Sequence, residues 1–277
     1  LGSLHPATRF NIDRDYGALG HSRRADVIML DDDLNVYNTW LGGQLVVENK
    51  KITSMLDKQL SNNRYLYPQK AYKTVIIPKQ FNLVPSIPDK ENFKINIIKT
   101  KLPGIMTFLE TIKINKKPKS WNEILIAHNL CHLCVIERHG KNGNYAHGFI
   151  KNFNLKSGAV ASSVGHDAHN IIVSGLNKKD MKMAVDLVNE YQGGIVIVNN
   201  EKLISKVELP IAGLLSEKKA KEVAEDNKLF KENWAKSGCT LAYMGFNLLP
   251  LSVIPNIRLT NKGLVDVKKM KIIPLFE

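Results

Sequence analysis

Short apolar runs separated by turn residues dominate this chain, and most of them predict β-strands. Runs rich in β-branched and aromatic residues and bounded by Gly, Pro, Asn or Asp are typical of strands. One pair of runs flanks Gly42-Gly43 and another flanks Asn199-Asn200, so both pairs are expected to form hairpins. The strands that we expect lie at 25–30, 36–41, 44–48, near 52, 74–77, 93–98, 106–114, 133–136, 159–164, 171–175, 194–198, 202–209, 257–260 and 263–267.

Only a few segments have the apolar spacing or the capping residues that predict a helix. Asn177, followed three residues later by Asp180, predicts the start of a helix over 178–191, and Gly193-Gly194 predicts its end. A second helix is expected to begin near Ser216 and to run to about residue 236. We expect a short helix end at 1–9, short helical pieces in a polar linker at 56–75, and either a helix or a strand at 146–153. This order of strands and helices predicts an α+β fold.

Composition narrows the class of protein. The chain has 277 residues, of which 44% are hydrophobic, so a sizeable core is expected. No run of 18 apolar residues predicts a membrane span. The net charge of +13 comes from lysines spread along the whole chain without a nucleic-acid motif, so no specific nucleic-acid partner is expected. Three cysteines are too few for a disulfide scaffold, and no signal pattern opens the chain, which together favour the cytoplasm.

The densest polar cluster lies between two of the expected strands. His166, Asp167, His169 and Asn170 crowd onto one sharp connection, where rigid strands could hold them for chemistry. Two imidazoles and a carboxylate could bind a metal, relay a proton or grip a heterocycle. One connection offers too few ligands for a complete metal site, so substrate contact or support of another group is the better hypothesis. The alternative is a turn whose side chains satisfy local backbone groups.

Other polar groups allow weaker hypotheses. Glu137, Arg138 and His139 follow an expected strand and could order a cleft or bind substrate, or simply form a surface turn with an ion pair. Cys131 and Cys134 resemble half of a zinc site, but residues three apart in a strand point to opposite faces, so ordinary thiols are expected. The run from Asp31 to Asp33 is expected to be a solvated turn.

Six segments carry a family resemblance: GAVASSVGHDAHNIIVSGL at 158–176, and 135–140, 193–198, 209–214, 249–255 and 263–267. Together they resemble the C-terminal domain of bacterial adenine deaminases, members of the amidohydrolase superfamily. Near the N-terminus, residues 5–9 and 23–28 resemble the end of an amidohydrolase barrel. The chain departs from the family pattern at His21-Ser22, where Pro-Gly is common, and at Gly165 and Ala168, where Ala and Ser are more frequent. The resemblance is weakest over 56–120.

The resemblance implies a division of the chain and a reaction. Residues 1–55 correspond to the end of the barrel and a small β-layer, 56–105 to a connecting region, and 106–277 to an α+β C-terminal domain. The implied reaction hydrolyses adenine to hypoxanthine and ammonia, with manganese or iron activating water. The barrel and its first-strand His-x-His motif are absent from the sequence, so we expect a C-terminal piece that does not deaminate adenine by itself.

The same resemblance implies roles for the polar clusters. His166, Asp167 and His169 are expected to be catalytic, Asn170 and residues 137–139 to bind substrate, and no residue of this chain to bind metal. Adenine is the expected partner, and the full-length enzyme is expected to be a homo-oligomer. The alternative function is a non-catalytic purine-binding or scaffolding domain, and a non-specific nucleic-acid binder ranks third.

Overall fold

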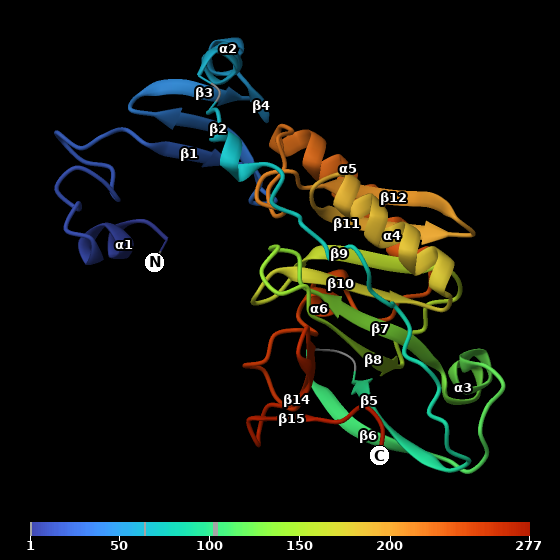
Figure 1. Cartoon of the computed structure of the whole chain (residues 1–277). Helices are drawn as coiled ribbons and strands as arrows, with labels where there is room; N and C mark the ends of the chain where they lie inside the picture. The colour runs from blue at the N-terminus through green and yellow to red at the C-terminus, as the bar shows by residue number, and fades with distance from the viewer. Residues whose placement is uncertain (1, 64, 102–104) are drawn as a thin grey trace. The chain divides into compact units, whose positions relative to one another are not determined.

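The computed structural model describes residues 2–63, 65–101 and 105–277. The chain divides into two compact units, Leu1–Leu66 and Tyr67–Glu277 (Figure 1). Helices and strands occur together in several sheets, which confirms the predicted α+β class. The elements of the first unit are α1 (Leu4–Arg9), β1 (Val27–Leu30), β2 (Val36–Leu41), β3 (Gln44–Glu48), β4 (Lys51–Ile52) and α2 (Ser54–Asn62).

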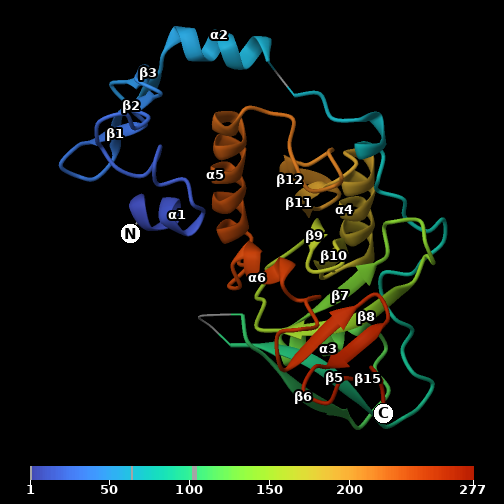
Figure 2. The ribbon, with the colours of Figure 1, turned by 90° about the vertical axis from the view of Figure 1, so that its left-hand side faces the viewer.

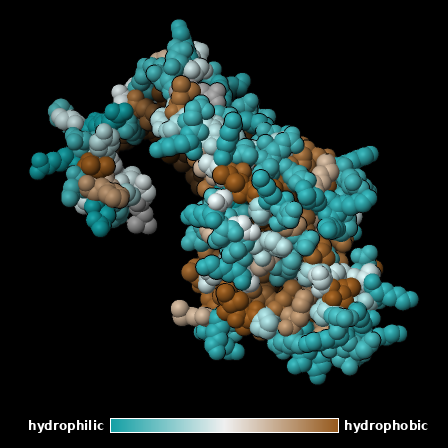
Figure 3. Space-filling view, viewed as in Figure 1, coloured by the Kyte–Doolittle hydropathy of each residue, from teal (hydrophilic) through white to brown (hydrophobic). Residues whose placement is uncertain are grey.

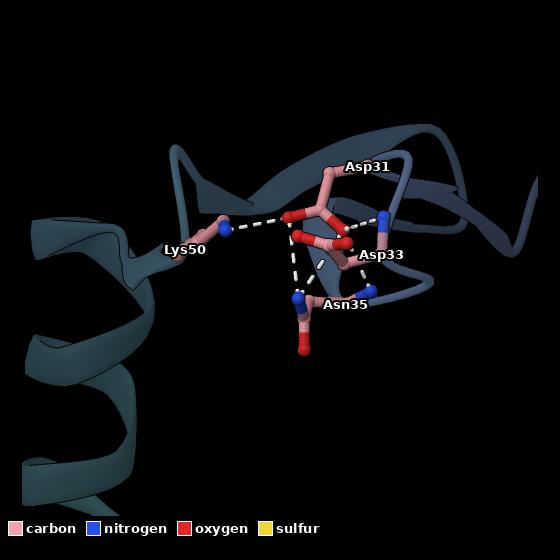
Figure 4. Close-up of polar contacts among 4 residues, drawn as sticks. All are labelled: Asp31, Asp33, Asn35 and Lys50. Carbon is pink, nitrogen blue, oxygen red and sulfur yellow. Dashed lines mark hydrogen bonds and ion pairs between the residues drawn. The ribbon is translucent and has the colours of Figure 1, made fainter.

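The first unit is built on an antiparallel sheet in the order β1-β2-β3-β4. Gly42 and Gly43 make the β2–β3 turn with φ of 58° and 82°, values that favour glycine, as the hairpin signal predicts. Asp31 closes the β1–β2 turn by accepting hydrogen bonds from the backbone N–H of Asn35 at 2.8 Å and from Lys50 Nζ at 2.5 Å (Figure 4). The turn predicted at Asp31–Asp33 is therefore stabilised by hydrogen bonds to the Asp31 carboxylate.

The second unit is built on an eight-stranded sheet in the order β12-β11-β9-β10-β7-β8-β5-β6. Neighbouring strands run antiparallel except for the parallel pair β5 and β8. A separate three-stranded sheet has the order β13-β14-β15. The strands are β5 (Phe93–Thr100), β6 (Thr107–Ile114), β7 (Leu130–Ile136), β8 (Tyr145–Lys151), β9 (Ala159–Gly165), β10 (Asn170–Gly175), β11 (Gly194–Asn199), β12 (Lys202–Glu208), β13 (Ile257–Thr260), β14 (Gly263–Asp266) and β15 (Lys271–Ile273).

Each face of the large sheet has its own hydrophobic core. On one face, α4 (Lys178–Glu190) packs its apolar stripe against β9, β10 and β11. On the other face lie α5 (Ala220–Lys236), α6 (Tyr243–Asn247) and the three-stranded sheet. Figure 2 shows α4 and α5 on opposite sides of β11 and β12. The sheet thus becomes a buried middle layer whose strands are apolar on both sides.

A third cluster closes the end of the sheet around β5. Trp121, the first residue of α3 (Trp121–His128), stacks on Phe276 with ring centroids 5.9 Å apart. The chain's last residues run beside β5, where Lys94 and Glu277 exchange backbone hydrogen bonds of 2.8 and 3.0 Å. The C-terminal segment thereby covers strand residues that would otherwise be exposed.

Most strand predictions are confirmed, and one is wrong. Residues 74–77 form no strand, because the segment makes only an isolated bridge between Ile76 and His139. The strand predicted at 133–136 is longer than expected: it begins at Leu130, directly after α3. The undecided segment 146–153 is the strand β8. The 3-10 turn η1 (Gln69–Ala71) falls within the 56–75 linker, where short helical pieces are predicted, and α3, α6 and β15 are additions.

Hydrophilic residues cover most of the face shown in Figure 3, with small hydrophobic patches between them. This agrees with the even spread of lysine along the sequence. Within the described ranges, no helix combines the length and the apolar character that crossing a bilayer requires.

Candidate functional site

The predicted polar cluster forms a tight turn between two buried strands. β9 ends at Gly165 and β10 begins at Asn170, and these two residues face each other in the antiparallel register. A Cβ on Gly165 would lie 2.6 Å from the carbonyl oxygen of Asn170, so this close approach requires glycine. The His166 and His169 rings lie 5.3 Å apart, and Asp167 is exposed. The turn therefore displays its side chains at the end of a rigid sheet.

Two residues that follow β7 hold this turn in place. β7 is the neighbour of β10, so residues 137–139 lie beside the turn, although they are about 30 positions away in sequence. Arg138 Nε donates to the carbonyl oxygen of His169, and His139 Nε2 lies 2.8 Å from the carbonyl oxygen of Ala168. Both bonds go to main-chain oxygens, so they fix the backbone of the turn and leave its side chains free.

Arg138 also joins a third segment to the turn. Its side chain is 1% exposed, and Nη2 donates to the carbonyl oxygen of Ala212 at 3.1 Å. Gly213 packs directly on the guanidinium, since a Cβ there would lie 2.6 Å from Nη1. Burial lowers the pKa of Arg138 to about 10, so the side chain remains a cation at neutral pH.

Glu137 binds its own loop. The carboxylate accepts hydrogen bonds from the backbone N–H groups of the following loop, at 2.5 to 3.4 Å. Burial alone raises the pKa of Glu137, but these hydrogen bonds outweigh it and hold the pKa below its usual value. The donors are His139, Lys141, Asn142 and Gly143. This geometry gives Glu137 a supporting position behind the turn.

A pocket of about 340 Å³ opens beside the turn. Several polar side chains that line it make no hydrogen bond or ion pair within the described ranges, in contrast to Glu137, whose carboxylate binds its own loop. Polar groups that line a concave site and lack protein partners are available to a ligand. These groups are His166, Asp167, Asn170, Ser252 and Lys262.

Two of the buried groups near the turn lack a protein partner at a specific atom. Asn170 is 5% exposed, and its Oδ1 meets no donor within the described residues. His169 Nδ1 is likewise buried without a partner among them. The pKa of His169 is lowered below its usual value of 6.5, so a neutral ring is favoured at pH 7. The largest cause is burial, and the nearby His166 and the Arg138 cation add to it. A neutral imidazole can accept a proton.

The residues described here do not fit a metal site. No group of three His, Cys, Asp or Glu side chains is gathered closely enough to hold an ion within the described ranges. Cys131 and Cys134 belong to the cores on opposite faces of the sheet, as their spacing predicts. Both are free thiols, as is Cys239.

The structure thus brings together all seven predicted site residues, although what each does is not fixed by their proximity. The pocket is also lined by Ser252, Asn261 and Lys262, which the sequence did not predict. No motif marks them, because only the packing of segments far apart in the chain brings them beside the turn.

Comparison with known proteins adds an independent line of information. The family model described as adenine deaminase C-terminal domain matches residues 105–271. The whole chain is 55% identical to "Adenine deaminase 2" of Bradyrhizobium sp. (strain ORS 278), over 278 aligned positions. "Adenine deaminase" of Chelativorans sp. (strain BNC1) is 54% identical, and that of Clostridium botulinum (strain ATCC 19397 / Type A) is 32% identical over 99% of the chain. The chain spans 46% of the length of each of these relatives.

Proposed function

Because this chain belongs to the adenine deaminase C-terminal domain family, we propose that it forms the C-terminal part of an enzyme that hydrolyses adenine to hypoxanthine and ammonia. The observation that carries the proposal is the 55% identity to an adenine deaminase over the entire chain. The match extends through both units, so it is not limited to one shared module. Purine salvage in the cytoplasm would be the setting, which the three free, buried thiols favour.

The turn between β9 and β10 is the part of this chain that we assign to the active site. Its groups have the chemistry that a purine needs: the Asn170 amide can accept from or donate to a ring edge, and Asp167 can accept from an N–H. His169, whose pKa is lowered by its partial burial, can take a proton during attack on the ring. His166 borders the same pocket and can orient the bound base. Arg138 and His139 act through the turn, whose carbonyl groups they hold.

A divalent metal, manganese or iron, is the cofactor that the resemblance implies. The described residues of this chain do not fit such an ion, because their candidate ligands are at most paired. We therefore assign this chain the binding and orientation of the base and derive no step at the metal from its residues.

A chimera tests the proposal. This chain would be joined to the N-terminal portion of the Bradyrhizobium relative, loaded with manganese, and assayed for ammonia release from adenine, with the intact relative as positive control. We expect an active chimera, and His166→Ala should lower kcat/KM by roughly 100-fold. His128→Ala is the matched control, because His128 lies at the end of α3 and outside the pocket. A folded, metal-loaded chimera that releases no ammonia would refute the proposal.

A non-catalytic purine-binding domain is the second candidate. The observation that favours it is the set of polar pocket groups without protein partners in a part of the chain whose described residues assemble no metal site. The chimera separates the two candidates, since a binding domain would retain adenine affinity while His166→Ala leaves turnover unchanged. Assembly into a homo-oligomer belongs to the same proposal, and light scattering of the chimera measures it.

A further inference from the structure

The loop between β7 and β8 contains the only Asn-Gly pair in the 277-residue sequence, Asn142-Gly143. Such a pair is chemically labile, because glycine has no side chain and its backbone nitrogen can approach the side-chain carbonyl carbon of the preceding asparagine. Asn142 is exposed, so water can reach it. The loop therefore carries a candidate site for a covalent modification that needs no enzyme.

The reaction is deamidation through a cyclic imide. The backbone nitrogen of Gly143 forms a bond to Cγ of Asn142, and the side-chain amide leaves as ammonia, taking with it the proton that the backbone nitrogen loses. Water then adds to one of the two ring carbonyl carbons and opens the ring. The product is aspartate or, where the main chain now runs through the side chain, isoaspartate. In both products oxygen replaces the amide nitrogen, which raises the mass of the chain.

Hydrogen bonds hold both reacting groups of this pair. The Gly143 N–H, which carries the nucleophile, donates to Glu137 Oε2 at 3.1 Å. The side-chain oxygen of Asn142 accepts from the backbone N–H of Asn144 at 2.9 Å, which fixes the side-chain amide in a local turn. The first of these bonds must break before the reaction, because the Gly143 nitrogen has to lose its proton and bond to Cγ.

The rest of the loop keeps the nucleophile in place. The Glu137 backbone N–H donates to the carbonyl oxygen of Asn144 at 2.9 Å, so the loop closes on itself. Gly143 is half-buried and lies against Pro78, since a Cβ on the glycine would come within 3.3 Å of the proline side chain. The nucleophile is therefore held within the loop, while the amide that would leave is exposed.

Glu137 is a poor base for this reaction. Its carboxylate is shared among four backbone N–H groups of the loop. Burial raises the pKa of Glu137, but the hydrogen bonds from these groups outweigh it and hold the pKa below its usual value. A carboxylate with a low pKa does not readily take a proton from an amide nitrogen. The contact with Glu137 therefore restrains the Gly143 N–H without activating it.

We propose that Asn142 is a latent deamidation site which Glu137 protects, so that the pair reacts only when the loop opens or the carboxylate is lost. The reaction would be felt at the pocket. Isoaspartate lengthens the main chain, so the loop can no longer present the same N–H groups to Glu137. One of these groups belongs to His139, whose Nε2 lies 2.8 Å from the carbonyl oxygen of Ala168. Deamidation would therefore loosen one of the two side chains that hold the β9–β10 turn.

The rate of deamidation in the 277-residue chain tests this proposal. The chain would be incubated at pH 8 and digested, and the peptide that carries Asn142 would be followed by mass spectrometry. We expect Glu137→Ala to deamidate about tenfold faster than the native wild type, with Glu137→Gln, which keeps one acceptor oxygen, in between. Glu190→Ala removes an exposed carboxylate at the end of α4 and should keep the wild-type rate. Asn142→Gln should abolish the change in mass.

Two measurements on the wild type do not depend on whether a variant folds. Deamidation in urea gives the rate without protection, and we expect the native chain to react at least about tenfold more slowly. Hydrogen exchange of the native chain should show the Gly143 amide protected to a similar degree. The inference is overturned if native and unfolded chains deamidate equally fast, if the Gly143 amide exchanges as in the unfolded chain, or if Glu137 variants that circular dichroism shows to be folded keep the wild-type rate. None of these outcomes depends on activity towards adenine, so they leave the proposed function to the chimera.

Discussion

Arg138 Nε donates a hydrogen bond to the main-chain carbonyl of His169, joining segments 31 residues apart in sequence. The same guanidinium donates to Ala212, so one buried cation fixes two loops at the edge of the pocket. Several measurements on the chain follow from this arrangement and from the buried groups around it.

Replacing Arg138 should destabilise the second unit. Arg138→Lys keeps the charge but cannot reach both carbonyl groups, and Arg138→Met leaves both unpaired. We expect losses of about 2 kcal/mol for lysine and about 3 kcal/mol for methionine in the free energy of unfolding, measured in urea. Full stability of Arg138→Lys would show that the two hydrogen bonds contribute nothing measurable.

Gly213→Ala should be more damaging than an ordinary replacement at positive φ. Gly213 has φ of 72°, and its Cβ would lie 2.6 Å from Arg138 Nη1. Gly143→Ala is the matched control, with φ of 64° and a nearest contact of 3.3 Å to a proline side chain. We expect about 1 kcal/mol of destabilisation for Gly143→Ala and about 3 kcal/mol for Gly213→Ala in urea unfolding. Equal values would mean that the loop moves away from the guanidinium without cost.

The carboxylate of Glu137 should stabilise the loop that follows it in a pH-dependent way. Its pKa is lowered in the folded chain, so its contribution is present above the usual pKa of 4.5 and is lost as the pH falls through the folded value. Glu137→Gln should cost about 1–2 kcal/mol at pH 7, and the difference from wild type should shrink in acid. Urea unfolding at pH 7 and pH 3 measures this, with the exposed Glu190→Gln as control. A difference that is constant with pH would contradict it.

Acid should destabilise the chain through His132. Its ring is 3% exposed and packs against Trp121 and Phe149. The pKa of His132 is lowered to about 4, mainly by this burial and to a smaller extent by the nearby His147. The unfolded state binds a proton at about pH 6.5, so stability should fall as the pH drops from 6.5 to 4, by up to about 3 kcal/mol. His132→Phe removes this group, and its stability should depend less steeply on pH over that window. Identical slopes in urea unfolding would disprove the assignment.

The three thiols should be unreactive in the native chain. Burial raises the pKa of Cys131 to about 12 and raises that of Cys134 and Cys239 as well. Iodoacetamide at pH 8 should leave all three unmodified in buffer and modify all three in urea, as read by mass spectrometry. Rapid labelling of any thiol in the native chain would show that it is exposed by local opening.

Local signals in the sequence were sufficient for many elements. Asn177 caps α4 by accepting from the backbone N–H of Asp180 at 2.8 Å, as predicted, because a cap depends only on neighbours in the chain. The strand predicted at 74–77 was wrong because strand formation depends on a distant partner, and Ile76 finds only one bridge at His139. The helix α3 was missed because its apolar residues run directly into those of β7.

The candidate site was predictable in part. The turn at 166–170 is visible as a polar cluster between apolar runs, and residues 137–139 as a polar group after a strand. These two clusters lie side by side because β7 pairs with β10, and no local sequence pattern reveals that pairing. Lys262 carries no signal at all, since an exposed lysine in a lysine-rich chain is ordinary until the small sheet is placed against the large one.

The pairing of residues 275–277 with β5 has a consequence for synthesis on the ribosome. β5 is made early in the second unit, yet Lys94 and Asn96 find backbone partners only in Glu277 and Leu275. The newly synthesised strand therefore lacks these backbone partners, and its inner side chains stay uncovered, until some 180 further residues have been translated. During that interval the nascent chain depends on β6 and β8 alone, or on a chaperone, to keep this edge from pairing elsewhere.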